Sequence, residues 1–182
     1  MMEFLDKVKK VMEEQFGDIT ENEGCLRVIA KNMGTFNSNA IVEISWMQFR
    51  EGAEHAHPVL QFYSTLARDI EDEEIPSMKA GLWELNRYTM LGNYGYYEPF
   101  RQIYHCYRMP VNLGQQEAAL EEIRYYLEQL KRQLNTFLDY VLILAENSKP
   151  MSIVDYIIGT NAGAVMEELI QGMDEIKKDM EK

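Results

Sequence analysis

The chain has 182 residues, of which 46% are hydrophobic and 26% charged, a composition typical of one soluble globular domain. Its formal net charge is −12, and such a field repels nucleic-acid phosphates and anionic lipid surfaces, so we expect neither nucleic acid nor membrane among its partners. The opening residues lack the apolar segment of a signal peptide, and no apolar run approaches the roughly 18 residues of a membrane span. Two cysteines are too few for a disulfide framework. We therefore expect a cytoplasmic location.

The first third of the chain predicts one helix followed by three strands. Apolar residues recur at helical spacing from Phe4 to Phe16, and Gly17 is placed to end that helix. Three later stretches are β-branched and alternate between apolar and polar positions, which is typical of antiparallel strands with one covered face. The predicted strands are residues 25–31, 39–49 and 58–67.

An acidic run at residues 69–74 precedes Pro76 and a second predicted helix, "SMKAGLWELNRYTM". A proline in the first helical turn, with carboxylates just before it, suits the free amides at a helix start. The run therefore favours helix capping over a metal site or a site for a basic partner.

A tyrosine-rich hairpin is predicted next, because "NYGYY" and "FRQIYHCYRM" flank Glu98 and Pro99, a pair suited to a tight turn. Side chains alternate across a strand, so the second strand has two distinct faces. One face carries Ile103, His105, Tyr107 and Met109, and the other carries Phe100, Gln102, Tyr104, Cys106 and Arg108.

A long helix is predicted from Asn112, with Gln115 three residues later in a pattern that resembles a capping box. Carried through to Ala145, it would span about 50 Å at 1.5 Å per residue, longer than the width of a five-stranded sheet at about 4.8 Å per strand. We expect part of its apolar seam to overhang the sheet and to need another partner. The seam, spaced alternately by three and four residues, is Leu120, Ile123, Leu127, Leu130, Leu134, Phe137, Val141 and Leu144.

Two further helices are predicted after residue 150, joined at "GTNAG". The last of them has an apolar stripe of Val165, Leu169, Ile170, Met173 and Ile176. The sequence thus predicts an α+β fold in the order α-βββ-α-ββ-α, with an antiparallel five-stranded sheet, a long helix and extra C-terminal helices. We divide it into an α+β domain, residues 1–146, and a C-terminal helical extension, residues 147–182.

Over roughly residues 2–146 the chain resembles the YbjN family, and through it the type III secretion chaperone-like fold. The resemblance is carried by "LWELNRYTMLGNYGYY", by the strand "FRQIYHCYRMPV" and by the following leucine-rich helix. Two features depart from the family pattern: Glu98-Pro99 stands where Asp or Gly usually turns the hairpin, and residues after 150 have no counterpart. The resemblance implies a small, acidic, often dimeric cytosolic protein that handles other polypeptides and has neither catalytic residues nor cofactors.

Candidates for chemistry are few. His55 and His57 have the spacing most typical of metal ligands, and a metal-dependent enzyme using them is one alternative. Adjacent residues of a strand point to opposite faces, so His105 and Cys106 cannot both ligate one ion. Neither Cys106 nor Cys25 lies at a predicted helix N-terminus that would activate a nucleophile. We expect no enzyme, no cofactor and no metal site.

The remaining hypothesis is protein binding. The hairpin tyrosines either pack within the sheet or present a contact surface to an extended client or a second subunit, a use to which tyrosine is well suited. We expect a non-enzymatic, chaperone-like or regulatory module that binds another protein or peptide as a homodimer. The alternative is a sensor that binds a small ligand in a pocket between the sheet and the C-terminal helices. The candidate partner-binding residues are Tyr94, Tyr96, Tyr104, Tyr107, Leu134 and Phe137.

Overall fold

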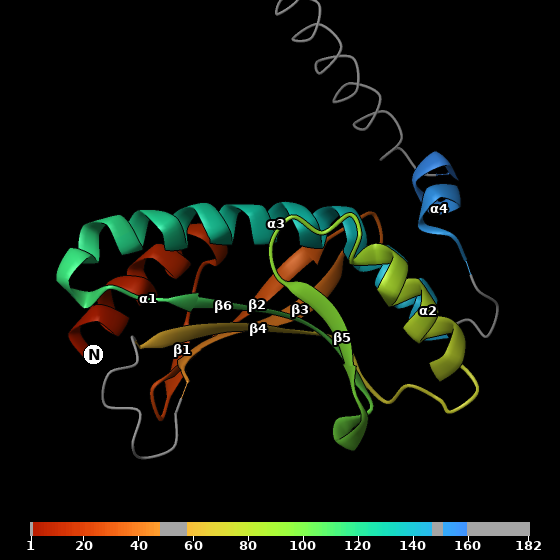
Figure 1. The fold of residues 1–182 in the computed structure, drawn as a ribbon, viewed down its shortest axis with the longest axis horizontal. Helices are drawn as coiled ribbons and strands as arrows, with labels where there is room; N and C mark the ends of the chain where they lie inside the picture. The colour runs from red at the N-terminus through yellow and green to blue at the C-terminus, as the bar shows by residue number, and fades with distance from the viewer. Residues whose placement is uncertain (1, 48–57, 147–150, 160–182) are drawn as a thin grey trace, which may run out of the picture.

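The computed structural model describes residues 2–47, 58–146 and 151–159, which form one layer of helices on one face of an antiparallel sheet (Figure 1). The helices are α1 (Met2–Phe16), α2 (Ile75–Leu85), α3 (Gln116–Glu146) and α4 (Ile153–Gly159), with short 3-10 turns η1 (Glu98–Phe100) and η2 (Leu113–Gln115). The strands are β1 (Thr20–Asn22), β2 (Cys25–Met33), β3 (Ser38–Trp46), β4 (Val59–Ala67), β5 (Asn93–Tyr97) and β6 (Gln102–Pro110).

The sheet of the described residues has six strands in the order β1-β2-β3-β4-β6-β5, all antiparallel, so the α+β class is confirmed and the predicted count of five is wrong. The missed strand is β1, which pairs with β2 through a tight turn at Glu23 and Gly24, both with positive φ. All three β1 residues are exposed and polar. The alternation that reveals a half-buried strand is therefore absent from β1.

Helices α1 and α3 lie side by side over one face of the sheet (Figure 1). The residues beneath them are the inward-facing positions of the strands, including Val42, Ile44 and Phe62, which are fully buried. Trp46 lies on the same face and contacts Phe4 of α1 at 6.0 Å between ring centroids. No described helix covers the opposite face, so the core lies entirely on one side of the sheet.

The apolar seam of α3 is buried along its whole length, which corrects the prediction that part of it would overhang. Leu134 and Phe137 are 1% and 9% exposed. Beyond the sheet, α3 meets α2, where Gly81 lies against Leu144, and α4, where Tyr140 and Tyr156 pack at 5.3 Å. The chain's own short helices thus cover the part of the seam that was expected to need a second subunit.

Asp139 ties α3 to the loop between β2 and β3. Its buried carboxylate accepts hydrogen bonds from the backbone N–H and the hydroxyl of Thr35, both at 2.6 Å, and from the backbone N–H of Phe36 at 3.3 Å. Gly34 has φ +70, and a Cβ there would collide with this carboxylate. The loop can therefore approach α3 this closely only with glycine at position 34.

Asn86, just after α2, hydrogen-bonds to the outer edge of the sheet. Its side-chain Oδ1 accepts from the backbone N–H of Tyr94 at 2.7 Å, and its Nδ2 donates to the carbonyl of Tyr94 at 2.9 Å. These are the two bonds that a neighbouring strand would make to Tyr94. The side chain thus occupies part of the free edge of β5.

The turns and helix starts deviate in detail from the sequence expectations. Pro76 lies in the first turn of α2 as predicted, but Glu74 at the N-cap makes no side-chain capping bond. Elsewhere in the acidic run, Asp72 pairs with Arg101 at 3.0 Å. Asn112 accepts from the backbone N–H of Gly114 at 3.0 Å and caps η2, so α3 begins only at Gln116.

Helix α4 lies beyond the boundary at residue 146 but adds to the same core. Ile153 is fully buried, and the hydroxyl of Tyr140 donates to the carbonyl of Met151 at 2.9 Å. Glu84 of α2 accepts from the hydroxyl of Ser152 at 3.3 Å. The predicted extension therefore begins with a segment that packs on α2 and α3; its residues 147–150 and 160–182 lie outside the described residues.

Candidate functional site: the open face of the sheet

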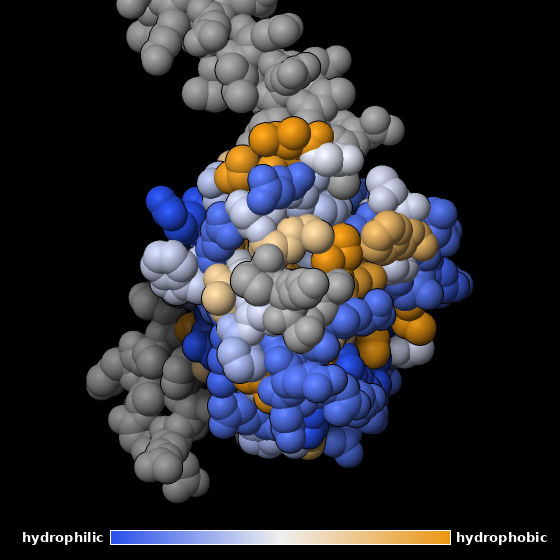
Figure 2. All heavy atoms as spheres, turned by 90° about the vertical axis from the view of Figure 1, so that its right-hand side faces the viewer, coloured by the Kyte–Doolittle hydropathy of each residue, from blue (hydrophilic) through white to orange (hydrophobic). Residues whose placement is uncertain are grey.

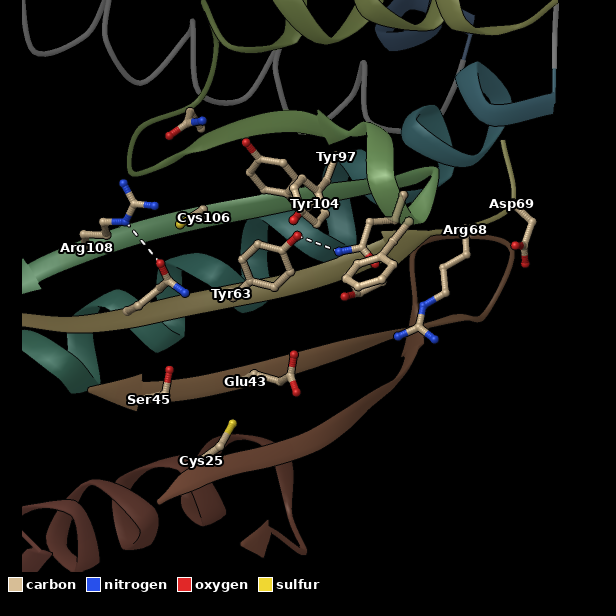
Figure 3. Close-up of a pocket in the computed structure, with 15 residues that line it drawn as sticks. Cys25, Glu43, Ser45, Tyr63, Arg68, Asp69, Tyr97, Tyr104, Cys106 and Arg108 are labelled. Atoms are coloured by element: carbon tan, nitrogen blue, oxygen red, sulfur yellow. Dashed lines mark hydrogen bonds between the residues drawn. The ribbon is translucent and has the colours of Figure 1, made fainter. Parts of the chain in front are cut away.

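The face of the sheet opposite the helices is hollowed, with a cavity of about 950 Å³ that opens broadly to solvent (Figure 3). It is built by the side chains that alternate with the core positions of β2 to β6, and we call it the open face. Its lining combines hydroxyl, amide, thiol, charged and aromatic groups. They are Cys25, Glu43, Ser45, Gln61, Tyr63, Thr65, Arg68, Asp69, Asn93, Tyr97, Phe100, Gln102, Tyr104, Cys106 and Arg108.

Two stacked tyrosines lie in the middle of the open face. The rings of Tyr63 and Tyr104 are 5.1 Å apart and inclined by 19°. The Tyr63 hydroxyl accepts a hydrogen bond from Nε2 of Gln102 at 2.6 Å, drawn as a dashed line in Figure 3. Gly95 lies opposite Tyr104 in the register, and a Cβ there would lie 2.6 Å from its ring. Glycine on β5 therefore leaves the room that the Tyr104 ring occupies.

Charges of both signs are arranged around this aromatic centre. Arg27 and Glu43 face each other across β2 and β3 and form an ion pair at 2.6 Å. Nε of Arg108 donates to Oε1 of Gln61 at 3.1 Å. Neither Arg108 nor Arg68 forms an ion pair with any described residue, and the two lie at opposite ends of the hollow (Figure 3).

The two cysteines both face the hollow but are poorly suited to nucleophilic chemistry. Burial raises the pKa of the Cys25 thiol, and the nearby Glu43 carboxylate raises it further. Burial also raises the pKa of the Cys106 thiol. A thiol with a raised pKa is largely protonated near neutral pH and attacks weakly. His105 points to the opposite face, as the alternation predicts, so it is no base for Cys106.

Of the six candidate partner-binding residues, Tyr104 is the one that faces the hollow. Tyr94 is 4% exposed and lies on the helix side against His105, at 4.9 Å between rings. Tyr107 lies on the same side and stacks on Tyr126 of α3 at 4.4 Å. Tyr96 is half-buried on the core and receives Lys79 over its ring at 5.3 Å. Leu134 and Phe137, being core residues, present no surface to a partner.

The sequence placed Phe100 on the same face of the hairpin as Tyr104, but it did not predict Tyr63, Tyr97 or Phe100 as partner-binding residues. These three contribute the remaining aromatic rings of the open face, and Tyr97 meets Phe100 edge-on at 5.4 Å. One signal could have found them: Tyr63 alternates with the buried Phe62 and Ser64, so it points away from the core.

The expected pocket between the sheet and the C-terminal helices is not where the hollow lies. The helix side of the sheet is filled by apolar side chains, while the hollow is on the other side and is lined by tyrosines without tryptophan.

The two histidines of the alternative metal site, His55 and His57, lie outside the described residues. Within residues 2–47, 58–146 and 151–159, no group of three His, Cys, Asp or Glu side chains is arranged to hold a metal ion.

His105 is buried beneath the helices and has a structural environment. Its Nε2 lies 2.8 Å from the carbonyl of Leu91, whereas Nδ1 has no hydrogen-bond partner among the described residues. Burial lowers the pKa of His105, and the bond to Leu91 opposes this only in part. The imidazole is therefore neutral in the folded protein at neutral pH.

We expect His105 to make the folded state sensitive to acid. As the pH falls below the ordinary histidine pKa of about 6.5, the unfolded chain binds a proton that the folded protein does not, so stability is lost. Thermal melting between about pH 7.5 and 5, the range in which an unperturbed histidine titrates, should show a steeper loss of Tm in the wild type than in His105→Gln. Glutamine keeps a donor for Leu91 but does not titrate. Parallel Tm profiles would contradict this assignment, because all carboxylates are common to both proteins.

Comparison of the chain with protein-family models finds no match, and comparison with curated proteins finds none either. Within the described parts of the chain, no helix combines the length and hydrophobicity needed to cross a membrane. What the fold and the site define is therefore a class: an α+β protein with one helix-covered sheet face and one open, aromatic face.

Proposed function

We propose that the protein is a non-enzymatic, cytosolic protein-binding module that acts as a homodimer, with the open face as the surface that receives the second copy. The observation that carries the proposal is the half-buried tyrosine stack of Tyr63 and Tyr104 on a sheet face that no described helix covers. Tyrosine is enriched at protein interfaces because its ring packs while its hydroxyl remains hydrogen-bonded.

The size of the open face suits a stable dimer. Four of its strands have nine residues, which is about 30 Å at ~3.3 Å per residue, and the four together are about 19 Å wide at ~4.8 Å per strand. With the shorter β5, the projected area is roughly 650 Å². A standard interface buries about 800 Å² of accessible surface per partner, and accessible surface exceeds its flat projection.

The charges of the open face suit a two-fold interface. A copy related by a two-fold axis meets the same surface, so each cation needs an anion on that surface. Arg68 and Arg108 provide cations that form no ion pair with any described residue, and Asp69 provides a carboxylate on the same face, where Glu43 is already paired with Arg27. Such self-complementarity favours a second copy over a uniformly acidic or basic partner.

The edges of the sheet are less suited to binding than its face. Asn86 already bonds Tyr94 on the outer edge of β5. The other edge is β1, three residues long, whose Glu21 pairs with Lys9 at 3.5 Å. Short, charged or covered edges discourage the addition of a further strand.

The resemblance to the YbjN family and the type III secretion chaperone-like fold supports the same proposal. The helices and strands from α1 to α3 follow the order that the sequence pattern predicts, apart from the added β1. On this proposal the module is chaperone-like or regulatory and requires no cofactor.

Two charge changes on the open face test the proposal. Tyr97→Asp and, separately, Arg108→Glu alter side chains that are exposed, so the monomer fold should tolerate them. The wild type is expected to be a dimer at tens of micromolar, and each variant should weaken the dimer by about tenfold or more, equivalent to ~1.4 kcal/mol. Sedimentation velocity and light scattering measure the association, and circular dichroism checks the fold.

Matched controls lie on the far side of α3. Tyr125→Asp and Arg132→Glu make the same two chemical changes at exposed positions away from the sheet and should leave the dimer intact. A wild-type protein that is monomeric at these concentrations, or a dimer unaffected by both open-face variants, would overturn the proposal. If the protein is a monomer that copurifies with one other polypeptide, the open face would bind that client and not a second copy of the chain.

A further inference from the structure

A second cavity, of about 680 Å³, lies where the C-terminal end of α1, the outer edge of β2 and the middle of α3 meet. We call it the edge cavity, and it shares no lining residue with the hollow of the open face. Strand β1 pairs with β2 only from Cys25 to Arg27, so the remainder of this edge of β2 has no neighbouring strand among the described residues. A volume of this size lies within the range of about 300–1,000 Å³ that is usual for sites of small ligands.

Apolar side chains form part of the wall of the edge cavity. Phe16 at the end of α1 is half-buried, and Ile29 of β2 is 49% exposed. Other exposed apolar side chains, Val154 and Ile158, lie on α4, where Figure 2 shows hydrophobic atoms gathered on the surface of the molecule. The apolar groups of the edge cavity differ from these because they line a hollow together with cations, so one ligand can contact both.

Lys131 of α3 is a cation held in a fixed position at the edge cavity. Its Nζ donates to the carbonyl of Gln15 at 2.9 Å and lies 6.0 Å from the centroid of the Phe16 ring. An ammonium group has three N–H donors, and the bond to Gln15 uses one of them. Lys131 forms no ion pair with any described residue. The contacts with α1 therefore orient a positive charge whose remaining donors can serve a ligand.

Hydrogen-bond donors outnumber carboxylates around the edge cavity. Oδ1 of Asn135 accepts from the backbone N–H of Gly34 at 3.3 Å, which leaves Nδ2 of Asn135 as a donor. Lys31 adds a second cation that has no ion pair within the described parts of the chain, whereas Arg27 is already in one. Among the described residues that line the cavity, Asp18 is the one with a carboxylate, and it is exposed. The balance of charge favours an anionic ligand.

We propose that the edge cavity binds a small organic anion, with its anionic group at Lys131 and Asn135 and its apolar part against Phe16 and Ile29. Hydrogen bonds between a cation and an anion are stronger than neutral ones, and burial of the apolar part adds to the affinity. The net charge of −12 repels anions in general, so binding depends on these local donors. The site does not depend on the proposed dimer, because the open face takes no part in it.

Octanoate is the probe that tests the proposal on the full-length chain, since it joins a carboxylate to an apolar tail. Isothermal titration calorimetry should show saturable binding at one site per chain with a Kd below about 1 mM. Octanol has a tail of the same length without the charge, and acetate has the charge without the tail. We expect each of them to bind at least about tenfold more weakly than octanoate. The backbone amide signals of Ile29 and Lys31 should shift in NMR spectra as octanoate is added.

Asn135→Asp tests the polar end of the cavity with little change in shape. Aspartate keeps the acceptor for Gly34 but replaces the donor Nδ2 by a negatively charged oxygen, so octanoate should bind at least about tenfold more weakly. Asn112→Asp is the matched control far from the cavity, because Asn112 likewise accepts from a backbone N–H, that of Gly114. It should leave the Kd of octanoate within about twofold of the wild-type value.

Lys131→Met removes the fixed cation and should weaken octanoate binding to a similar extent. Arg132→Met is its control, because it removes the same charge from the next residue of α3, which is exposed and does not line the cavity. Circular dichroism checks the fold, and if Lys131→Met does not fold, Asn135→Asp decides alone.

Three results would overturn the edge cavity as an anion site. They are the absence of saturable octanoate binding, equal binding of octanol or acetate, and equal effects of the cavity variants and their controls. A loss of octanoate binding in Arg108→Met, with normal binding in Asn135→Asp, would overturn it as well by placing the anion on the open face.

Discussion

Leu134→Asp is expected to abolish folding. Leu134 is 1% exposed beneath the helix layer, and a charge at this position loses both its hydration and the packing of the leucine. Core Leu→Ala substitutions alone cost about 2–5 kcal/mol, and an unpaired buried carboxylate costs more, so the sum approaches the total stability of about 5–15 kcal/mol of a typical domain. Far-UV circular dichroism and urea denaturation should show a largely unfolded chain.

The outcome separates two roles for the α3 seam. If Leu134 were an interface residue, the charged variant would be a folded, soluble monomer, and the burial described above would be contradicted. Tyr125→Asp is the matched control, because Tyr125 lies on the same helix and is 52% exposed. It should change the free energy of unfolding by less than about 0.5 kcal/mol, the usual range for surface substitutions.

Asp139→Ala is expected to destabilise the fold by about 3 kcal/mol, because it leaves two backbone N–H groups and a hydroxyl of the β2–β3 loop without their shared acceptor. The loss should appear in urea denaturation and, locally, as faster hydrogen exchange at Thr35 and Phe36. Asn135→Ala is a matched control one helical turn away, since Asn135 accepts a single, longer bond of 3.3 Å from Gly34. A loss below about 1 kcal/mol for the Asp139 variant would mean that water replaces the carboxylate.

Much of the fold could be predicted from the sequence because its elements have strong periodic patterns. The α3 seam, the alternation of β3 and β6 and the turn at Pro99 are local signals, and the structure confirms them. The prediction that the end of α3 would overhang the sheet was wrong, because other segments of the chain cover that end. Gly81 of α2 and Tyr156 of α4 contact α3 only through the tertiary fold. Periodicity identifies an apolar stripe but does not say which element will cover it.

The candidate site was predicted less well than the fold. The sequence separated the two faces of β6 correctly but did not show which of them the helices cover, so tyrosines from both faces were taken as candidates. Tyr104 faces the hollow, whereas Tyr94 and Tyr107 belong to the core. The aromatic centre depends on Tyr63, 41 residues before Tyr104, and only the register of β4 with β6 brings the two rings together.

The pairing of β4 with β6 has a consequence for how the chain is made. Strands β1 to β4 are connected in order and can form from local contacts as they leave the ribosome. The second neighbour of β4 is β6, and α2 and β5 are synthesised before β6. The pairing of Thr65 with Tyr104 can therefore form only after β6 has been translated. Until β6 is translated, β4 is an unpaired edge strand rich in apolar side chains. Helix α3, which covers the core side of the sheet, is translated later still.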